Sequence, residues 1–266
     1  MQTLFIPLGF VIAGMYLIVS IMCLILFRSK NTDLNIPARS FAVVTILLHI
    51  VYIMYIVVTF HRLPLASVFE ALSFTALVLT VTYIFIQYTS KENGTGFFIF
   101  PIIFVLQTVS AFNLKTIVPL SEINPVLASP YFAMHTVPSI LGYASFLISM
   151  KYSLMYLLMH SQIKARHFGL LYEKIPNLDG LDKLNKKAII TGFTLLSIGI
   201  LTGLLWAPSA WQIQDPNSPK VIASFILWLL YGTALVLRLF FGWQGKRSAI
   251  ISLAGGVILM LSFFVI

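Results

Sequence analysis

Eight apolar stretches constrain this chain more than any other feature, because a membrane-spanning helix needs about 20 mostly apolar residues. Only 9% of the 266 residues are charged and 59% are hydrophobic, whereas a soluble domain carries about 25% charged residues. Lipid offers no water to backbone polar groups, so such stretches must be helical. The sequence predicts one all-α integral membrane domain over residues 1–266. Its transmembrane helices, about eight, are expected near residues 4–27, 40–60, 66–88, 96–113, 131–158, 188–207, 220–240 and 248–266.

The distribution of basic residues predicts the orientation of these helices. Cytoplasmic loops of membrane proteins carry an excess of Lys and Arg. Of the 17 basic residues, only Arg62, Lys115 and Lys220 fall in the loops of one side. We therefore expect both termini, and the loop at residues 206–220, to be extracytoplasmic. The net charge of +9 follows from the same rule. No basic stripe is interleaved with aromatic residues, so we expect no nucleic-acid binding.

The residues that enzymes use for catalysis do not form a recognisable pattern. The single cysteine, Cys23, cannot form an internal disulfide, a CxxC redox pair or a CxxCH haem-attachment site. The sequence also contains no GxSxG, HExxH, Walker or dinucleotide-binding motif. We therefore expect a protein that binds or presents a ligand and is not an enzyme.

Three histidines lie where an imidazole could bind a ligand. His49 falls near the bilayer midplane, where a polar ring is costly and normally faces the bundle interior. It either forms hydrogen bonds with a neighbouring helix or binds a buried metal or haem. His135 falls about four residues into the fifth helix, roughly 6 Å below the outer interface. His61 ends the second helix on that side. Neutral imidazole is a good axial ligand for haem iron.

Glu70 is an acidic residue about one helical turn below the predicted outer interface, soon after Arg62 in the sequence HRLPLASVFEAL. A lone carboxylate at that depth should find a partner. Two interpretations stay open. Glu70 forms a structural ion pair or a contact with the start of the third helix, or it orients a ligand or a metal-bound histidine.

The loop at residues 206–220 combines Trp206, Trp211, Asp215 and Pro216. Tryptophans at this level are often simple members of an interfacial aromatic belt. Here their density favours a shaped surface, because indole rings stack on flat macrocycles. The Asp215–Pro216 pair is typical of a turn. The loop is therefore a candidate platform for a flat apolar ligand.

Three stretches of the sequence resemble the cytochrome c assembly family of the CcsA/CcmC type, which has HemX-like relatives and carries a tryptophan-rich haem-handling motif. They are LPLASVFEALSF, the GYASF segment at Gly142–Phe146 after His135, and LDGLDKLNKKAIITGFTLLSIGILTGLLWA with the W…DP, WLLYG and GWQGKRSAIISLAGGVILML segments that follow it. The resemblance covers about residues 40–266.

The resemblance implies residues for haem b binding. His135 matches the first outward axial histidine of the family, and His49 is a candidate membrane-embedded haem contact. Trp206, Trp211, Asp215 and Pro216 match parts of the tryptophan-rich motif. Two positions depart from the family pattern. Val236 stands where a second outward histidine is expected, and Arg62, next to His61, stands where members often carry a histidine.

The resemblance also implies a function and a cellular location. The expected function is the delivery or presentation of haem on the outer face of the bacterial cytoplasmic (inner) membrane for cytochrome c assembly. The expected partners are membrane lipid, haem and an assembly protein with a large extracytoplasmic domain. Two alternatives stay open. One is a HemX-like regulator or scaffold in tetrapyrrole biosynthesis without stable haem binding. The other is a small-solute transporter, for which only His49 and Glu70 would offer a midplane site.

Overall fold

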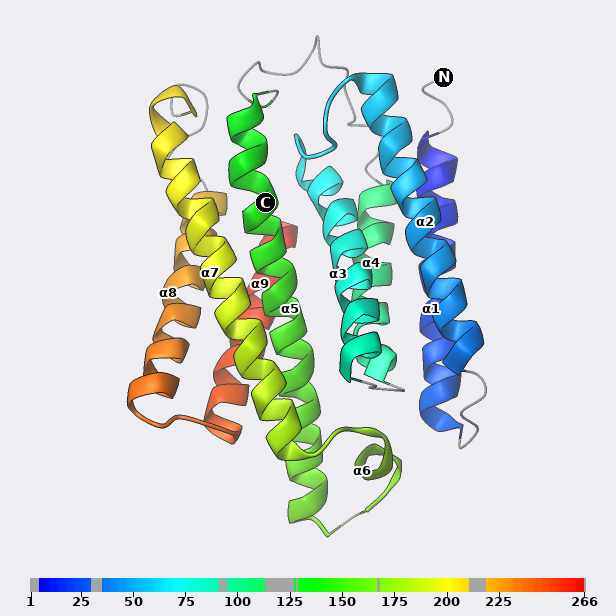
Figure 1. Ribbon diagram of the computed structural model, residues 1–266, viewed down its shortest axis with the longest axis vertical. Coiled ribbons are helices and arrows are strands. Elements are labelled where there is room, and N and C mark those ends of the chain that lie inside the picture. The colour runs from blue at the N-terminus through cyan, green and yellow to red at the C-terminus, as the bar shows by residue number, and fades with distance from the viewer. Residues whose placement is uncertain are drawn as a thin grey trace. The chain divides into compact units, whose positions relative to one another are not determined.

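The computed structural model describes residues 5–29, 35–90, 95–112, 127, 129–166, 168–210 and 219–265 (Figure 1). The chain forms two compact units, residues 1–128 and 129–266. Unit 1 contains α1 (Phe5–Arg28), α2 (Asn35–Phe60), α3 (Val68–Ser90), the 3-10 helix η2 (Thr95–Phe98) and α4 (Phe100–Phe112). Unit 2 contains α5 (Pro130–Lys164), α6 (Leu170–Lys174), α7 (Leu178–Ala210), α8 (Pro219–Phe240) and α9 (Lys246–Val265).

The predicted all-α membrane fold is confirmed. Within the described ranges, seven helices are long and apolar enough to cross a membrane. The fourth predicted span, residues 96–113, is shorter than expected, because a 3-10 turn precedes an α-helix of only 13 residues. Pro101 explains where that helix begins, since proline has no N–H to donate and is favoured in the first turn. That the whole chain is one domain stays a prediction.

Helix α7 begins ten residues before the predicted span. Residues 178–187 continue the helix and pack through Leu181 and Asn185, which are 0% and 2% exposed. Asp179 lies in the first turn, where a negative charge favours the helix dipole. Residues 178–187 are therefore the first turns of α7 and not a separate surface helix. The prediction began at residue 188 because it followed apolar residues only, and residues 178–187 are largely polar.

Unit 1 is held together by one continuous buried stripe on each of its long helices. In α1 the buried positions recur every three or four residues, which brings them to one helix face. They include Ile12, Tyr16, Val19, Cys23 and Leu26. The stripe of α2 is Ala38, Ala42, Thr45, His49, Tyr52, Ile56 and Phe60. His49 therefore lies inside the unit, as expected for a midplane histidine.

In unit 2, α5 and α7 pack closely because glycines lie at their contact. A Cβ added at Gly142 of α5 would lie 2.9 Å from the backbone nitrogen of Leu196 and 3.1 Å from the carbonyl oxygen of Gly192, both in α7. Small residues permit this kind of backbone approach between membrane helices. The next turn of α5 carries Phe146, which stacks on Tyr231 of α8 with ring centroids 3.7 Å apart.

Replacing Gly142 by alanine will destabilise unit 2, because the added methyl group meets backbone atoms that cannot rotate away. We expect a loss of about 1–3 kcal/mol, typical of an overpacked core. The measurement is the thermal unfolding midpoint of the purified protein in detergent. Gly14→Ala is the matched control, since a Cβ there meets nothing within 4 Å. An equal effect of both changes would contradict the close-packing argument.

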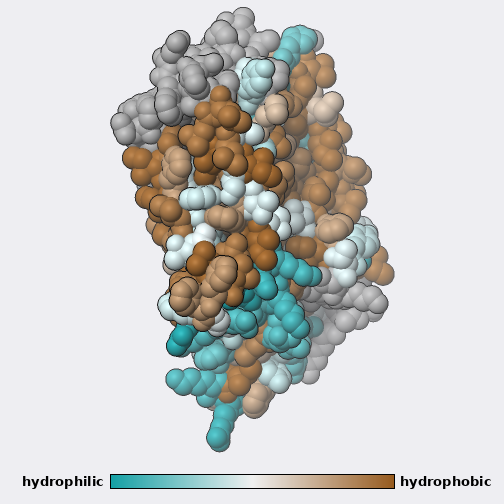
Figure 2. All heavy atoms as spheres, turned by 60° about the vertical axis from the view of Figure 1, so that its left-hand side comes forward, coloured by the Kyte–Doolittle hydropathy of each residue, from teal (hydrophilic) through white to brown (hydrophobic). Residues whose placement is uncertain are grey.

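The outer surface of unit 2 suits a lipid environment. Figure 2 shows hydrophobic side chains covering the side of α7 and α8, while hydrophilic ones gather at the end where α5 finishes and α6 lies. Exposed apolar residues on these helices include Leu201, Leu204 and Leu229. The polar end carries Lys164, Arg166, Lys174 and Lys183. This basic end is the one that the charge rule assigns to the cytoplasm.

Candidate functional site

Helix α7 fixes which ring nitrogen of His135 carries the hydrogen. Ser129 caps α5 by accepting a hydrogen bond from the Phe132 backbone N–H, which fixes the helical turn that precedes His135. The Nδ1 atom of His135 lies 2.7 Å from the carbonyl oxygen of Gly199. A carbonyl oxygen only accepts, so Nδ1 carries the hydrogen and donates it. In the neutral ring, Nε2 then keeps its lone pair, and it has no hydrogen-bond partner among the described residues.

Two glycines of α7 make room for side chains of α5, Gly203 for the His135 imidazole and Gly199 for Ser139. A Cβ added at Gly203 would lie 2.6 Å from Nδ1 and 2.9 Å from Cε1 of His135. A Cβ added at Gly199 would collide with the Ser139 hydroxyl, one turn after His135 in α5. The half-buried His135 ring therefore occupies a notch that only a glycine at position 203 leaves open.

The segment predicted as a tryptophan-rich loop, residues 206–220, follows this notch, but its first five residues still belong to α7, which ends at Ala210. Trp206 belongs to α7, three residues after Gly203. The side chain of Trp206, and Trp211, Asp215 and Pro216 entirely, lie outside the described residues. Their role as a stacking platform stays a prediction.

His49 lies in a polar network that links all four α-helices of unit 1. Its Nδ1 is 2.8 Å from the Tyr16 hydroxyl of α1, and its Nε2 is 3.0 Å from the Ser73 hydroxyl of α3. Ser73 donates in turn to the Gln107 side-chain oxygen of α4 at 2.9 Å. The ring is 0% exposed. Fully satisfied networks of this kind specify one packing arrangement of a core.

The hydrogen-bonded interpretation of His49 is therefore confirmed. Both of its ring nitrogens have protein partners, so binding of iron would require the release of Tyr16 or Ser73. The role of His49 as a haem ligand stays a prediction. Next to this network, a small pocket is lined by Tyr52, Glu70, Ser73 and Ser110. The hydroxyls of Tyr52 and Ser110 are buried and have no partner among the described residues, so the pocket offers polar groups to a bound water.

Arg62 and Glu70 form the predicted ion pair, and that interpretation is confirmed. The guanidinium donates through Nη1 to Oε2 at 2.8 Å and through Nη2 to Oε1 at 2.6 Å. Oε2 also accepts from the Ala66 backbone N–H at 2.8 Å, while Ser67 caps α3 by accepting from the Glu70 N–H. His61, exposed and with φ 54, begins this turn. The pair closes the connection between α2 and α3.

Sequence reasoning missed the residues that complete these sites. Tyr16, Ser73 and Gln107 belong to no motif, and no candidate site in the sequence included Asp182 or Arg238. Arg238 donates to the Asp182 carboxylate and, at 2.8 Å, to the Ser248 hydroxyl. A buried polar residue on a regular apolar helix stripe is the one signal that could have found Ser73 and Gln107.

Val236 provides no second ligand next to His135. It lies two residues before Arg238 in the last turns of α8, near the α7 start that carries Asp182. His135 lies opposite Gly199, toward the other end of α7. In the described ranges, no group of three or more His, Cys, Asp and Glu side chains could hold a metal ion. One imidazole with an available Nε2 nevertheless fits an axial ligand of haem iron.

The fold and these sites define a multi-pass helical membrane protein with polar side chains buried at defined depths. The chain belongs to the cytochrome c assembly protein family, whose model matches residues 65–266.

Several similar proteins carry the name cytochrome c biogenesis protein CcsA. The one from Chlamydomonas reinhardtii is 29% identical over 207 residues, which cover 75% of this chain and 57% of that protein. One from a strain of Prochlorococcus marinus is 30% identical over 224 residues, 75% of this chain and 71% of that protein. The chain thus spans little more than half the length of the Chlamydomonas relative.

Proposed function

We propose that this protein, as a membrane protein of cytochrome c biogenesis, receives haem b and presents it on the outer face of a bacterial cytoplasmic membrane. The observation that carries this proposal is the hydrogen bond that fixes the tautomer of the His135 imidazole. Its Nδ1–H donates to the Gly199 carbonyl at 2.7 Å, so Nε2 is the nitrogen that would bind the haem iron. A hydrogen bond from the second nitrogen fixes the ring of a metal-binding histidine and raises its basicity.

The residues around His135 would keep the imidazole in place rather than take part in bond-making chemistry. Gly199 accepts its hydrogen bond, and the notch at Gly203 sets its position against α7. Trp206 follows Gly203 by three residues, and with Trp211 it would stack against the porphyrin plane. Asp215 and Pro216 would shape the loop. His61 and His49 would serve as further haem contacts. Haem is the cargo here, and we expect no catalysis by the chain itself.

The proposal includes the orientation of the protein in the membrane and a partner protein that takes over the haem. The charge rule puts the His135 end of unit 2 outside, because the opposite end carries Lys164, Arg166 and Lys174. A haem presented there must pass to another protein. We propose an assembly partner with a large extracytoplasmic domain.

The test is the absorption spectrum of detergent-purified protein from haem-replete cells. We expect a Soret band in the wild type and its loss, by about tenfold or more, in His135→Ala. His160→Ala is the matched control, because His160 lies near the opposite end of α5 and stacks on Tyr156. Gly203→Ala should also weaken the band, since its methyl group displaces the imidazole. A haem-free wild type, or a band that His135→Ala leaves unchanged, would overturn the proposal.

A HemX-like regulator or scaffold is the second candidate. It is favoured by the two hydrogen-bonded nitrogens of His49 and by Val236 at the position of the second histidine. A regulator of this kind would act through its basic loops without holding haem. Deletion would then change haem precursor levels and leave c-type cytochromes intact, whereas loss of a haem-presenting protein would remove them. A transporter is less favoured, because the His49 and Glu70 side chains are both engaged by the protein.

A further inference from the structure

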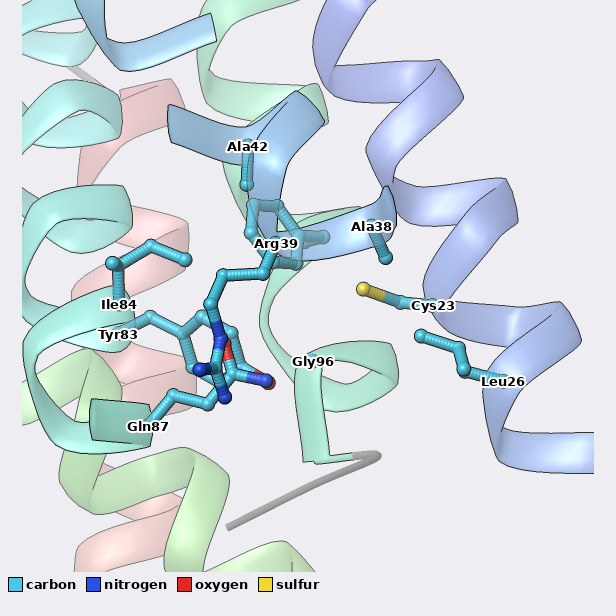
Figure 3. A pocket seen from close by; sticks show the side chains of 10 residues that line it. Cys23, Leu26, Ala38, Arg39, Ala42, Tyr83, Ile84, Gln87 and Gly96 are labelled. Atoms are coloured by element: carbon cyan, nitrogen blue, oxygen red, sulfur yellow. The ribbon is translucent and has the colours of Figure 1, made fainter. Parts of the chain in front are cut away.

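A recess opens at the end of unit 1 where α1 ends and α2 begins. Its enclosed part has room for about one water molecule or one phosphate oxygen, and the rest is open to solvent. Figure 3 shows its walls, which come from α1, α2, α3, η2 and the start of α4. Small residues create the space, namely Ala38, Ala42 and Gly96. A Cβ at Gly96 would lie 2.6 Å from the Cys23 sulfur.

Arg39 is the one charged residue among the side chains that line the recess. Its guanidinium carbon lies 4.6 Å from the centroid of the Tyr88 ring, which covers one face of the cation. Its Nε atom is buried and has no hydrogen-bond partner in the described part of the chain. No ion pair joins Arg39 to a carboxylate among the described residues. An arginine stays charged at any physiological pH, so this site has a positive charge, and the described residues provide no counter-ion for it.

Gln87 supplies a second, independent sign of a ligand. It is 6% exposed, and its Oε1 atom is buried without a hydrogen-bond partner among the residues that the structure describes. In Figure 3 the side chains of Arg39 and Gln87 extend toward each other in the recess. A buried amide oxygen without a partner is costly unless a ligand or water binds it. A half-turn of this amide presents its two N–H donors next to those of Arg39.

The position of the recess along the helices indicates the kind of molecule that fits. Arg39 is the fifth residue of α2, about 6 Å from the helix start, and Gln87 is one turn before the end of α3. This depth corresponds to the headgroup layer of a bilayer. Apart from the Tyr83 hydroxyl next to Gly96, the remaining walls are mostly apolar and include Leu26, Ile84 and Phe100. A molecule that fits both features has an oxyanion joined to an apolar body.

We propose that this recess binds the phosphate group of an anionic membrane lipid between Arg39 and Gln87. The planar fork of a guanidinium binds two phosphate oxygens at once, and the amide N–H groups of Gln87 bind a third. The acyl chains leave along the apolar wall into the bilayer. Free phosphate shares the same oxyanion chemistry but lacks the apolar body. The site lies within unit 1 and does not depend on haem binding at His135.

The test uses the full-length protein, purified in a non-ionic detergent and depleted of lipid. Dioleoyl phosphatidic acid should raise the Tm by roughly 5 °C at saturating concentration. Dioleoylglycerol, which has the same chains and no phosphate, should not. Inorganic phosphate should act only at concentrations about 100-fold higher or more, because it gains nothing from the apolar wall. A shift with phosphate at the same concentrations would assign the site to a free anion and contradict the lipid.

Three variants test whether the Tm shift with phosphatidic acid comes from binding in the recess. Arg39→Met should abolish the shift with phosphatidic acid. Gln87→Glu should also abolish it, because the new carboxylate pairs with Arg39 inside the protein, and it should raise the Tm without lipid. Arg28→Met is the matched control, since Arg28 lies near this end of the unit and does not line the recess. An equal loss in Arg28→Met would show only general attraction to anionic lipid and overturn the proposal.

The remaining outcomes are equally decisive. An equal shift with dioleoylglycerol would make the recess a purely apolar groove and contradict an oxyanion site. Asp33 and Glu92 are the two acidic residues in the connections near this end of unit 1. If the wild type shows no shift but Asp33→Asn or Glu92→Gln creates one, the chain itself supplies the counter-ion and the proposal is wrong. The absence of any shift in all variants would also overturn it.

Discussion

Glu70→Gln is expected to destabilise the protein by about 3 kcal/mol, within the 3–5 kcal/mol typical of breaking a buried ion pair. The side chains of Arg62 and Glu70 are 4% and 2% exposed, so water cannot replace the lost carboxylate. Glutamine keeps the shape of glutamate and one hydrogen bond, and it removes the charge that faces the guanidinium. The change should lower the Tm by about 6–10 °C in detergent. Glu173→Gln, on the exposed helix α6, should have little effect.

A double-mutant cycle separates the pair from other effects of the change. Arg62→Met alone should also be strongly destabilising, because it leaves the Glu70 carboxylate without its guanidinium. The double variant Arg62→Met with Glu70→Gln should lose less than the sum of the two single changes, by at least about 1 kcal/mol. Additive effects would contradict a coupled pair. Additivity would instead favour the interpretation in which Glu70 orients a ligand.

The helical frame could be predicted because one physical requirement dominates it. Runs of about 20 apolar residues can be only membrane helices when charges are so rare. Two helices, α4 and α7, differ in length from the predicted spans because of local packing that the length of an apolar run does not indicate. Helix α4 is short because its apolar run is shared with the 3-10 turn at Thr95–Phe98. Helix α7 is long because Leu181 and Asn185 are buried beyond the membrane-length segment.

The candidate site was predictable only in part, through the type and depth of single residues. The depth of His49 and His135 follows from their distance to helix ends, and the structure places both in helices as expected. Their partners do not follow from the sequence. Gly199 is 64 residues from His135, and Tyr16 is 33 residues from His49. Such contacts depend on the rotation of one helix against another, which the packing of glycines such as Gly142 and Gly203 determines.

Asp182→Asn is expected to have the second large effect, because one carboxylate connects three helices of unit 2. Asp182 lies in α7, and its Oδ2 pairs with Arg238 of α8. Its Oδ1 accepts the Gly245 N–H at 2.9 Å, just before α9. Gly245 has φ 64, a left-handed conformation that suits glycine and turns its N–H to the carboxylate. Arg238 is 5% exposed and also donates to the Ser248 hydroxyl.

Asparagine can accept one of these hydrogen bonds but leaves the buried Arg238 cation without its counter-charge. The expected loss is about 3 kcal/mol, measured as a lower Tm in detergent. Asp179→Asn provides the matched control. It removes a carboxylate three residues earlier in the same helix, where the ion pair with Lys183 is solvent-exposed on both sides. Exposed pairs contribute little, so the control should melt like the wild type. Similar melting of the two variants would show that the contacts of Asp182 do not hold α7, α8 and α9 together.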